Sequence, residues 1–286
     1  MTPIERALSS LDGLSAGDAF GEQFFYVAPD TIPSRRLPAG PWRWTDDTHM
    51  ALSIVEILGN YGHINQNALA RAFARRYADD PHRGYAGGAA RLLGKVYAGD
   101  DWRAIAPTLF GSGSYGNGGA MRAAPIGAFF SDDPERAARE AKLSAQVTHA
   151  HPEGQAGASA VAAAAAVAAS AGELTAETFI RETVRLTPDG KTRQLMEVSM
   201  DLGGRPAREA AAILGSGEQV SAQDTVPFSL WCAAHYLNDY QEALWNTVSG
   251  LGDRDTTCAI VGGIVVMRAP IPEEWLTRRE PLPSVV

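Results

Sequence analysis

The residues of this chain that are most able to do chemistry lie in two short acidic motifs, roughly two hundred residues apart. The first reads WTDDT at residues 44–48, and the second reads GDRDT at residues 252–256. Each directly precedes an apolar run with helical spacing. Neighbouring carboxylates repel one another, so a cation that takes oxygen ligands is a natural partner for them. Two such loop-to-helix junctions facing one another would form an oxygen cage suited to Mg²⁺ or Mn²⁺.

Other interpretations of the two motifs stay open. Asp and Thr at a helix start cap free N–H groups and favour the positive end of the helix dipole, which needs no metal. Arg254, between two aspartates, could form a surface ion pair. Considered jointly, the motifs supply enough carboxylates to neutralise two divalent ions, and we prefer the metal interpretation. The candidate ligands are Thr45, Asp46, Asp47, Asp253, Asp255 and Thr256.

A glycine-rich stretch, GSGSYGNGG at residues 111–119, is a further candidate site. Five glycines in nine residues cost conformational entropy, which is useful only where the backbone takes unusual angles or closely approaches another group. Free N–H groups where this loop runs into a helix would favour a phosphate. The pattern fits neither the P-loop nor the dinucleotide-binding fingerprint, so a flexible surface loop is the alternative.

Two other places carry polar residues with helical spacing. Asp18 and Glu22 share a helix face near glycines that recur every fourth residue, and they either lie in solvent or line a site. His149 and His151 stand two residues apart at an expected helix end. A histidine stabilised by the helix dipole, or one that lines a pocket, is favoured there over a zinc ligand, since no further nitrogen or sulfur ligand has useful spacing.

The elements that must position these residues are helical. Strand-like alternation is nearly absent, and the segment Thr31 to Arg43, with three prolines, is expected to be a loop. We therefore predict an all-α fold, a compact single domain over residues 1–286. Helical spacing is found at residues 4–25, 48–59, 66–78, 87–98, 134–147, 155–171, 175–186, 190–201, 206–214, 226–238, 240–249 and 256–267.

Composition limits the class of function. A formal net charge of -8, without a basic run, argues against general nucleic-acid binding. The alanine-rich segment from Ala156 to Ala171 is too short and too weakly apolar to span a bilayer, and it is expected to be an interior helix. The N-terminus lacks the pattern of a signal peptide. Cys232 and Cys258 form no metal-ligand pattern, so we expect reduced thiols in a cytoplasmic setting. We also expect a monomer with no membrane partner.

The motifs together resemble the ADP-ribosylglycohydrolases, which include the dinitrogenase-reductase-activating glycohydrolase and the animal ADP-ribosylhydrolases. The matches fall in the family's order from residue 13 to about residue 264, nearly the whole chain. They are GDAFG at 17–21, WTDDT at 44–48 followed by MAL at 50–52, GNGGAMR at 116–122, Thr148-His149, and GDRDT at 252–256.

The resemblance implies a compact helical fold of the orthogonal-bundle type, with two Mg²⁺ (or Mn²⁺) ions in a cleft, held by the six candidate ligands above. It implies hydrolysis of the bond at the anomeric carbon of ADP-ribose. The family's ADP-ribose-binding loop corresponds here to Gly113, Ser114, Tyr115, Gly116 and Asn117, and His149 matches the histidine near the distal part of the ligand. Asp18 and Phe110 are our further candidates for substrate binding. The catalytic candidates are Asp46, Asp47, Asp255 and Glu22.

Elementary chemistry agrees with this reading. Metal ions can orient ribose hydroxyls and an attacking water. The loop N–H groups suit a pyrophosphate, and Tyr115 or Phe110 could stack on adenine or on the distal ribose. A metal-bound Asp or Glu22 could act as the acid or base for the leaving group.

The loop from Phe110 to Arg122 looks closest to the branch that cleaves serine-linked and polymeric ADP-ribose. Two positions depart from the family pattern: Phe25 stands where a glutamate is common, and Leu251 stands where a glycine is usual. We expect a metal-dependent ADP-ribosylhydrolase, with an O-linked substrate favoured over N-linked arginine. The alternatives are a non-catalytic ADP-ribose-binding protein, and a dimetal hydrolase of a related nucleotide sugar or phosphoester.

Overall fold

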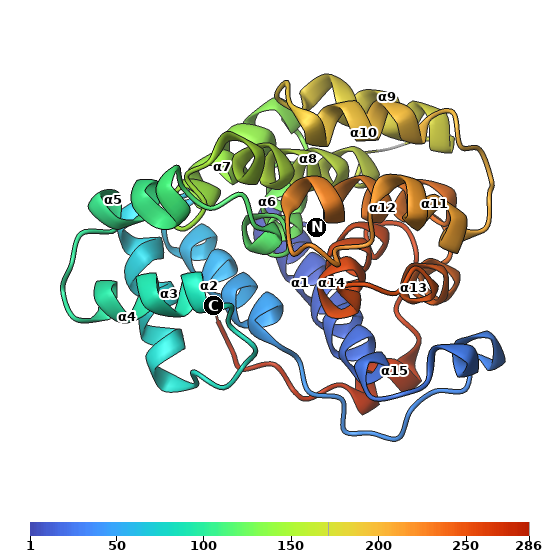
Figure 1. The fold of residues 1–286 in the computed structure, drawn as a ribbon, viewed down its shortest axis with the longest axis horizontal. Helices are drawn as coiled ribbons and strands as arrows, with labels where there is room; N and C mark the ends of the chain where they lie inside the picture. Colours follow the sequence, from blue (N-terminus) through green and yellow to red (C-terminus); the bar gives the residue numbers. More distant parts are fainter. Residues whose placement is uncertain (171, 286) are drawn as a thin grey trace.

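The structure, a computed structural model, describes residues 1–170 and 172–285, and these residues form helices and no sheet (Figure 1). Two isolated bridges, Trp42 with Arg279 and Gly116 with Ser221, are the only strand-like pairings in the described part of the chain. The predicted all-α class is confirmed. One hydrophobic cluster of buried residues runs from Ala7 to Trp275, and the single domain stays a prediction.

The long helices and the short ones between them have the following bounds. The α-helices are α1 (Pro3–Glu22), α2 (Asp46–Tyr61), α3 (Gln66–Asp79), α4 (Gly87–Tyr97), α5 (Trp102–Ile105), α6 (Ala124–Phe129), α7 (Pro134–Gln146), α8 (Pro152–Ala168), α9 (Ala176–Leu186), α10 (Lys191–Ser199), α11 (Ala207–Leu214), α12 (Ala222–His235), α13 (Tyr240–Ser249), α14 (Arg254–Val265) and α15 (Glu273–Arg278). The 3-10 helices are η1 (Gln23–Phe25), η2 (Pro29–Ser34), η3 (Ala106–Gly111) and η4 (Asn117–Gly119).

Helix α1 crosses the middle of the molecule beside α14, with α2 on its other side (Figure 1). It begins at a capping box, in which the Thr2 hydroxyl accepts a hydrogen bond from the Glu5 N–H and the Glu5 carboxylate accepts one from the Thr2 N–H. Its inner residues are buried along most of its length. The helix therefore forms the central support of the fold.

Glycines let α1 and α14 approach closely. A Cβ atom at Gly17 would lie 2.1 Å from the Cys258 carbonyl oxygen, and one at Gly21 would lie 2.2 Å from that of Arg254. Gly13 stands in the same relation to Gly262, at 2.4 Å. No side chain fits at these distances, so the face of α1 that carries these glycines (the glycine face) lies directly against the backbone of α14. The contact fixes α1 against the start of α14.

The alanine-rich helix α8 is buried on almost every side, as predicted for an interior helix. It packs against α7, α6, α9 and α12. It begins three residues earlier than expected, because Pro152 occupies the first helical position, where its missing N–H costs nothing. The helix ends at Ala168, and the last residue of the expected segment, residue 171, lies outside the described part of the chain.

Several other boundaries differ from the sequence pattern. The expected helix at 4–25 ends at Glu22 and continues as the 3-10 turn η1. The expected loop from Thr31 to Arg43 overlaps the 3-10 helix η2, because Pro29 and Pro33 both fit its φ angles. Helix α12 starts at Ala222 and keeps Pro227 inside, since the proline leaves only one backbone carbonyl without its helical partner. Helices α5, α6 and α15 are too short to show a clear period in sequence.

No helix within residues 1–170 and 172–285 combines the length and the apolar character needed to cross a bilayer.

Replacing Gly17 with alanine should push α1 away from α14, because the added methyl group overlaps the Cys258 carbonyl. We expect a loss of unfolding free energy of about 2 kcal/mol or more, measured by urea denaturation. The matched control is Gly87→Ala in the first turn of α4, where no atom lies within 4 Å of the new methyl group. Equal stability of the two variants would contradict the role given to the glycine contact.

Candidate active site and metal centre

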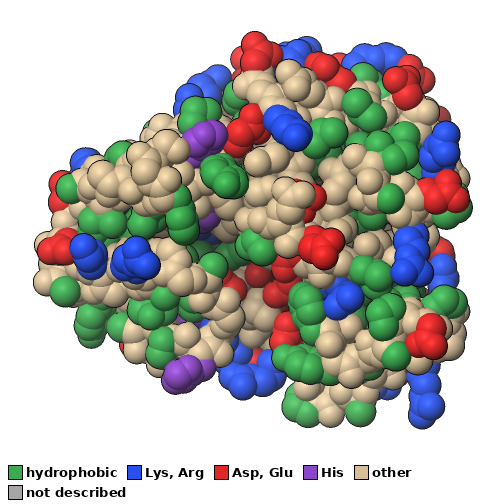
Figure 2. Space-filling model, in the orientation of Figure 1, with side chains coloured by type: hydrophobic (Ala, Val, Ile, Leu, Met, Phe, Trp, Pro, Cys, Tyr) green, Lys and Arg blue, Asp and Glu red, His purple; other side chains and the backbone are tan. Residues whose placement is uncertain are grey.

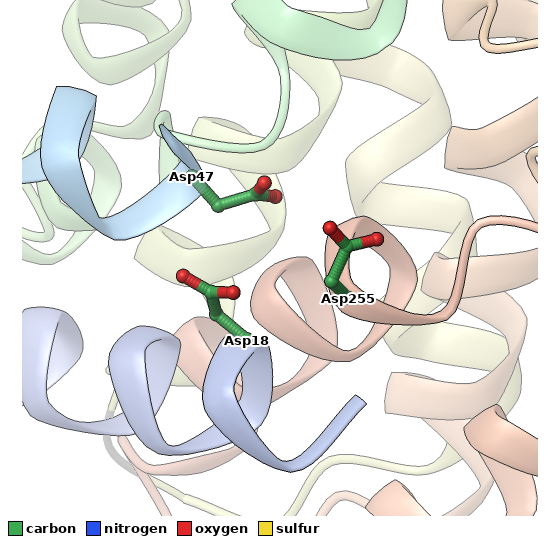
Figure 3. Close-up of side chains that lie close together, drawn as sticks. All are labelled: Asp18, Asp47 and Asp255. Atoms are coloured by element: carbon green, nitrogen blue, oxygen red, sulfur yellow. The ribbon is translucent and has the colours of Figure 1, made fainter. Parts of the chain in front are cut away.

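Three aspartates from three different helices meet at the centre of the molecule. Asp18 comes from α1, Asp47 from the first turn of α2, and Asp255 from the first turn of α14 (Figure 3). Each offers a carboxylate oxygen, and these oxygens lie within 4.8 Å of one another. Residues far apart in sequence are thus brought together by the α1–α14 contact and by the packing of α2 on α1.

Asp18 holds the start of α2 in place. Its carboxylate accepts hydrogen bonds from the backbone N–H groups of Thr45 and Thr48 and from both of their hydroxyls. The side chain is fully buried, and it does not line the large cavity described below. Direct contact of Asp18 with a substrate stays a prediction. Its place in the acidic group was missed in sequence, although it stands four residues before Glu22 on the glycine face.

The other predicted ligands surround this group. Asp46, Asp253 and Thr256 line the large cavity together with Asp47 and Asp255. The Thr45 hydroxyl lies deeper, where it donates to Asp18 and Asp47 carboxylate oxygens at 2.9 and 3.0 Å and caps α2. The capping interpretation of this motif is therefore confirmed, and the metal interpretation stays a prediction.

Burial without a cation gives the aspartates unusual acidities. Burial raises the pKa of Asp18 to about 6 and that of Asp46 to about 8, the latter helped by the neighbouring Asp18 charge. Burial, followed by nearby carboxylates, also raises the pKa values of Asp47 and Asp255 well above their usual range. These carboxyl groups therefore bind protons more readily than free aspartates do.

The residues present fit a divalent cation. The Asp47 Oδ1 atom is buried and has no hydrogen-bond partner, and a buried carboxylate oxygen without a partner is costly. The group consists of hard oxygen donors only, which suits Mg²⁺ or Mn²⁺ better than zinc. Within the described residues the group of possible metal ligands consists of aspartates.

A cavity of about 390 Å³ opens beside the carboxylates (Figure 2). Acidic side chains gather in the hollow at the centre of that face, with apolar side chains around it. The predicted substrate-binding residues Phe110, Ser114, Tyr115, Gly116, Asn117 and His149 line it, together with Gly84, Met50, Met121 and Val220, which the sequence did not single out. Gly113, in the same loop, does not line the cavity. It packs against the chain at residue 151, where a Cβ on Gly113 would meet the His151 backbone nitrogen at 2.7 Å.

The rim of this cavity carries exposed aromatic rings. Phe110 is 73% exposed and Tyr115 is 47% exposed, high values for large side chains beside a cavity. Phe110 also takes a positive φ of 53°, a conformation that L-residues seldom adopt. Rings held in this way can stack on a flat ligand group without first leaving a packed core.

The glycine loop is held over His149. A Cβ at Gly118 would lie 2.8 Å from the His149 ring, and one at Gly116 would lie 3.3 Å from its Nε2 atom. Asn117 anchors the loop by donating to the Asp253 carboxylate at 2.7 Å and to the Thr225 hydroxyl at 3.0 Å. The loop is thus tied to the carboxylate group at one end, and the alternative of a flexible surface loop is wrong.

Arg122, directly after the loop, is fully buried and has no carboxylate partner. It donates to the carbonyl oxygens of Gly118 and Ser144 and to the Thr148 hydroxyl, and its guanidinium lies 4.5 Å from the Phe73 ring centre. Burial lowers its pKa to about 9, so it stays positively charged at neutral pH. Sequence reasoning named Arg122 only as part of a motif, since a pattern does not show that an arginine is buried.

A short hydrogen-bond relay orients the His149 ring. The Thr148 hydroxyl accepts from Arg122 at 2.8 Å and lies 2.7 Å from His149 Nδ1. In the tautomer in which Thr148 donates its proton to Nδ1, the ring proton lies on Nε2, which faces Gly116. Burial, and then the Arg122 charge, lower the His149 pKa to about 3, so the ring is a neutral hydrogen-bond donor. His151, in contrast, caps α8 by accepting from the Glu153 N–H.

Glu22 lies in a second cleft and does not line the cavity beside the glycine loop. Its carboxylate accepts from the Tyr26 hydroxyl at 2.7 Å. Phe25, at the position of the usual glutamate, lies under Arg254, with 5.0 Å from ring centre to guanidinium. That contact replaces the surface ion pair considered for Arg254.

The family of this chain follows from its similarity to known proteins. The family model for ADP-ribosylglycohydrolase matches residues 1–284. The chain belongs to the ADP-ribosylglycohydrolase family. This confirms the resemblance seen in the motifs, and at the level of the family it confirms the prediction of a hydrolase.

Among curated relatives, the human ADP-ribosylhydrolase ARH3 is 28% identical, over 94% of this chain and 89% of its own length. The ADP-ribosylarginine hydrolase Tri1 of Pseudomonas putida is 25% identical, over 96% of this chain and 74% of its length. A solved structure described as an ADP-ribosylglycohydrolase-related protein complex superposes on this chain with a TM-score of 0.64 at 24% sequence identity. The match covers 97% of this chain and 93% of the other chain, and it supports the fold alone.

The raised acidities predict how stability depends on pH and metal. The folded pKa values of Asp18 and Asp46, about 6 and about 8, exceed the unfolded value of about 3.9, so the folded state binds more protons. In EDTA the melting temperature should therefore fall as pH rises from about 5.5 to about 8.

Mg²⁺ or Mn²⁺ should raise the melting temperature more at pH of about 8 than at about 5.5, because the cation competes with those protons. Thermal denaturation with and without each ion measures both effects. The control is the Asp255→Asn variant measured with and without the same ions, in which the added stabilisation should largely disappear. A stabilisation by metal that does not change with pH would contradict the assignment.

Proposed function

We propose that this protein is a metal-dependent ADP-ribosylhydrolase that cleaves the bond at the anomeric carbon of ADP-ribose on a modified target. The observation that carries the proposal is the buried group of Asp18, Asp47 and Asp255 at one end of a cavity whose other walls are a glycine loop and exposed rings. The family and the two relatives named above support the same reaction class.

The cavity has the chemistry of an elongated nucleotide sugar. The diphosphate would lie along the glycine loop, where backbone approaches without side chains are possible at Gly116. Adenine would stack on Phe110 or Tyr115. The neutral Nε2–H of His149 would donate to a ligand oxygen, and the distal ribose would reach the carboxylates.

Two divalent cations, Mg²⁺ or Mn²⁺, are proposed at the carboxylates, held by Thr45, Asp46, Asp47, Asp253, Asp255 and Thr256. A bound cation would supply positive charge and an orienting field for the sugar hydroxyls and a water. Among the chain's own groups, Asp255 is placed to hold a proton beside the reacting bond, because it lines both the cavity and the second cleft. Glu22, in the second cleft with Tyr26, is the proposed group for the leaving side.

An O-linked substrate is preferred over N-linked arginine. The support for this is the loop from Phe110 to Arg122, which resembles the branch that cleaves serine-linked and polymeric ADP-ribose. A non-catalytic ADP-ribose-binding protein is the second candidate, favoured by Phe25 in place of the usual glutamate. The buried carboxylates speak against it, because binding of the nucleotide half alone does not need them. A cytoplasmic monomer is part of the same proposal.

The decisive experiment measures release of free ADP-ribose from matched serine-linked, arginine-linked and polymeric substrates, with Mg²⁺, with Mn²⁺ and with EDTA. We expect metal-dependent release, fastest from an O-linked substrate. Tight binding of ADP-ribose with no release from any substrate would favour the binding protein.

Replacement of Asp255 with alanine separates the two candidates further. For an enzyme, kcat should fall by about a hundredfold or more, with a much smaller change in ADP-ribose affinity, since Asp255 lies at the reacting end of the cavity. Single-turnover kinetics and calorimetry measure the two quantities. A parallel loss of both would indicate that Asp255 only helps to hold the ligand.

The relay to His149 is tested by Thr148→Val, which keeps the shape of the side chain but removes the hydroxyl. The histidine tautomer is then no longer fixed, and we expect about tenfold weaker binding of ADP-ribose by calorimetry. Thr148→Ser retains the hydroxyl and should bind nearly as the unaltered protein does. Equal affinities for the two variants would show that the relay does not matter for binding.

A further inference from the structure

The second cleft adjoins the carboxylates on the side away from the glycine loop. It is lined by Glu22, Gln23, Tyr26, Pro41, Arg43, Trp44, Thr45, His82, Arg83, Gly84 and Asp255. Gly84 and Asp255 also line the large cavity, so the two spaces meet at these residues. None of the loop residues expected to hold the nucleotide half of a ligand lines the second cleft.

At Gly84 the boundary between the two spaces carries no side chain. Gly84 has a φ of +95°, which L side chains rarely adopt, and a Cβ there would lie 3.3 Å from the Asp46 carboxylate. A larger residue would crowd the passage beside the carboxylates. A ligand whose reacting bond lies at the carboxylates can therefore extend from one space into the other.

From this geometry we propose that the second cleft binds the polypeptide segment that carries the modified side chain, and that Arg43 selects an acidic residue next to that side chain. The inference rests on the proposed function, because it takes the reacting bond to lie at the carboxylates. The large cavity would bind ADP-ribose, and the second cleft would bind the polypeptide that leaves when the bond is cleaved.

The cleft offers free hydrogen-bond donors. Arg43 is exposed and makes no hydrogen bond or ion pair within the described residues. Its charge helps to lower the pKa of Glu280, but both carboxylate oxygens of Glu280 already accept hydrogen bonds from Arg83. The Trp44 Nε1 atom is buried without a partner, and the His82 side chain is exposed. Basic side chains are visible at the lower edge of the acidic hollow (Figure 2).

The same cleft also offers acceptors, which favour a polypeptide over a polyanion. Glu22 and Gln23 contribute carboxylate and amide oxygens from the end of α1, and Asp255 adds a further carboxylate. A peptide backbone has both N–H and C=O groups and can use both kinds of partner. A chain of diphosphates running through this cleft would be repelled by the Glu22 carboxylate. The exposed Tyr26 ring, 78% accessible, gives the segment an apolar surface to pack on.

Arg43 is well supported for a recognition role. It follows Trp42, which is buried and paired with the C-terminal segment through Arg278 and Glu280 backbone hydrogen bonds. Arg83 beside it is fixed by Glu280, by Asp80 and by stacking 3.6 Å above the Trp44 ring. Because Arg83 is occupied, Arg43 is the guanidinium of this cleft that is left to bind a carboxylate of a target.

The test uses three ADP-ribosylated peptides that differ only in the residue next to the modified one, which is Glu, Gln or Lys. The unaltered protein should prefer the Glu peptide over the Lys peptide by about fivefold in kcat/KM, as expected for one partly exposed ion pair. The difference should arise from KM, with kcat nearly equal for the two peptides. Arg43→Glu should reverse the order. Arg71→Glu, the same charge change at an exposed arginine on α3 outside both spaces, should leave the order as it is.

Calorimetry with free ADP-ribose accompanies these assays and should give one affinity for all three proteins, since Arg43 does not line the large cavity. An unchanged peptide order in Arg43→Glu would overturn the inference. So would an equal loss of affinity for free ADP-ribose, or a dependence on Arg43 that is stronger for polymeric ADP-ribose than for the Glu peptide.

Failure of the proposed function is distinguished in the same set of measurements. If the unaltered protein binds ADP-ribose but releases it from no peptide, the hydrolase assignment fails. The affinities of the same three peptides, measured by competition with labelled ADP-ribose, then decide whether Arg43 reads the neighbouring residue. If ADP-ribose itself does not bind, both proposals are wrong.

Discussion

The contact between the glycine face of α1 and the backbone of α14 is the constraint on which the rest of the site depends. A Cβ atom at Gly13, Gly17 or Gly21 would lie 2.1–2.4 Å from a carbonyl oxygen of α14, so the two helices are in contact without side chains between them. That approach brings Asp18 beside Asp255. Asp18 then binds the first turn of α2 and adds Asp47 to the group, so one packing contact and one carboxylate place all three acids.

The same arrangement explains why the site has excess negative potential. Buried carboxylates are tolerated where they are hydrogen-bonded, paired or bound to a cation. Asp18 meets that condition with four donor groups, whereas Asp47 keeps one buried oxygen without a partner. The nearest buried positive charge, Arg122, is engaged by carbonyl groups and a hydroxyl under the glycine loop. Proton uptake or a divalent cation must therefore complete the balance.

Much of this could be predicted from the sequence, and the reasons are local. Helical spacing, the two acidic motifs and the glycine loop each depend on neighbouring residues, and the all-α class and the cavity-lining residues Asp46, Tyr115 and His149 followed from them. Features that depend on residues distant in sequence did not follow. Gly84, the burial of Arg122 and the membership of Asp18 in the acidic group become visible only when α1, α2 and α14 are packed together.

The pairing of the first long helix with one near the other end of the chain also has a consequence for biosynthesis. Gly13 meets Gly262, so the contact closes a loop of most of the chain, and contacts of such long range form late and slowly. During translation, α1 emerges with an apolar face and no α14 to cover it. Until α14 follows, that face must be covered by other segments or by a chaperone. The group of Asp18, Asp47 and Asp255 cannot form in a nascent chain that lacks α14.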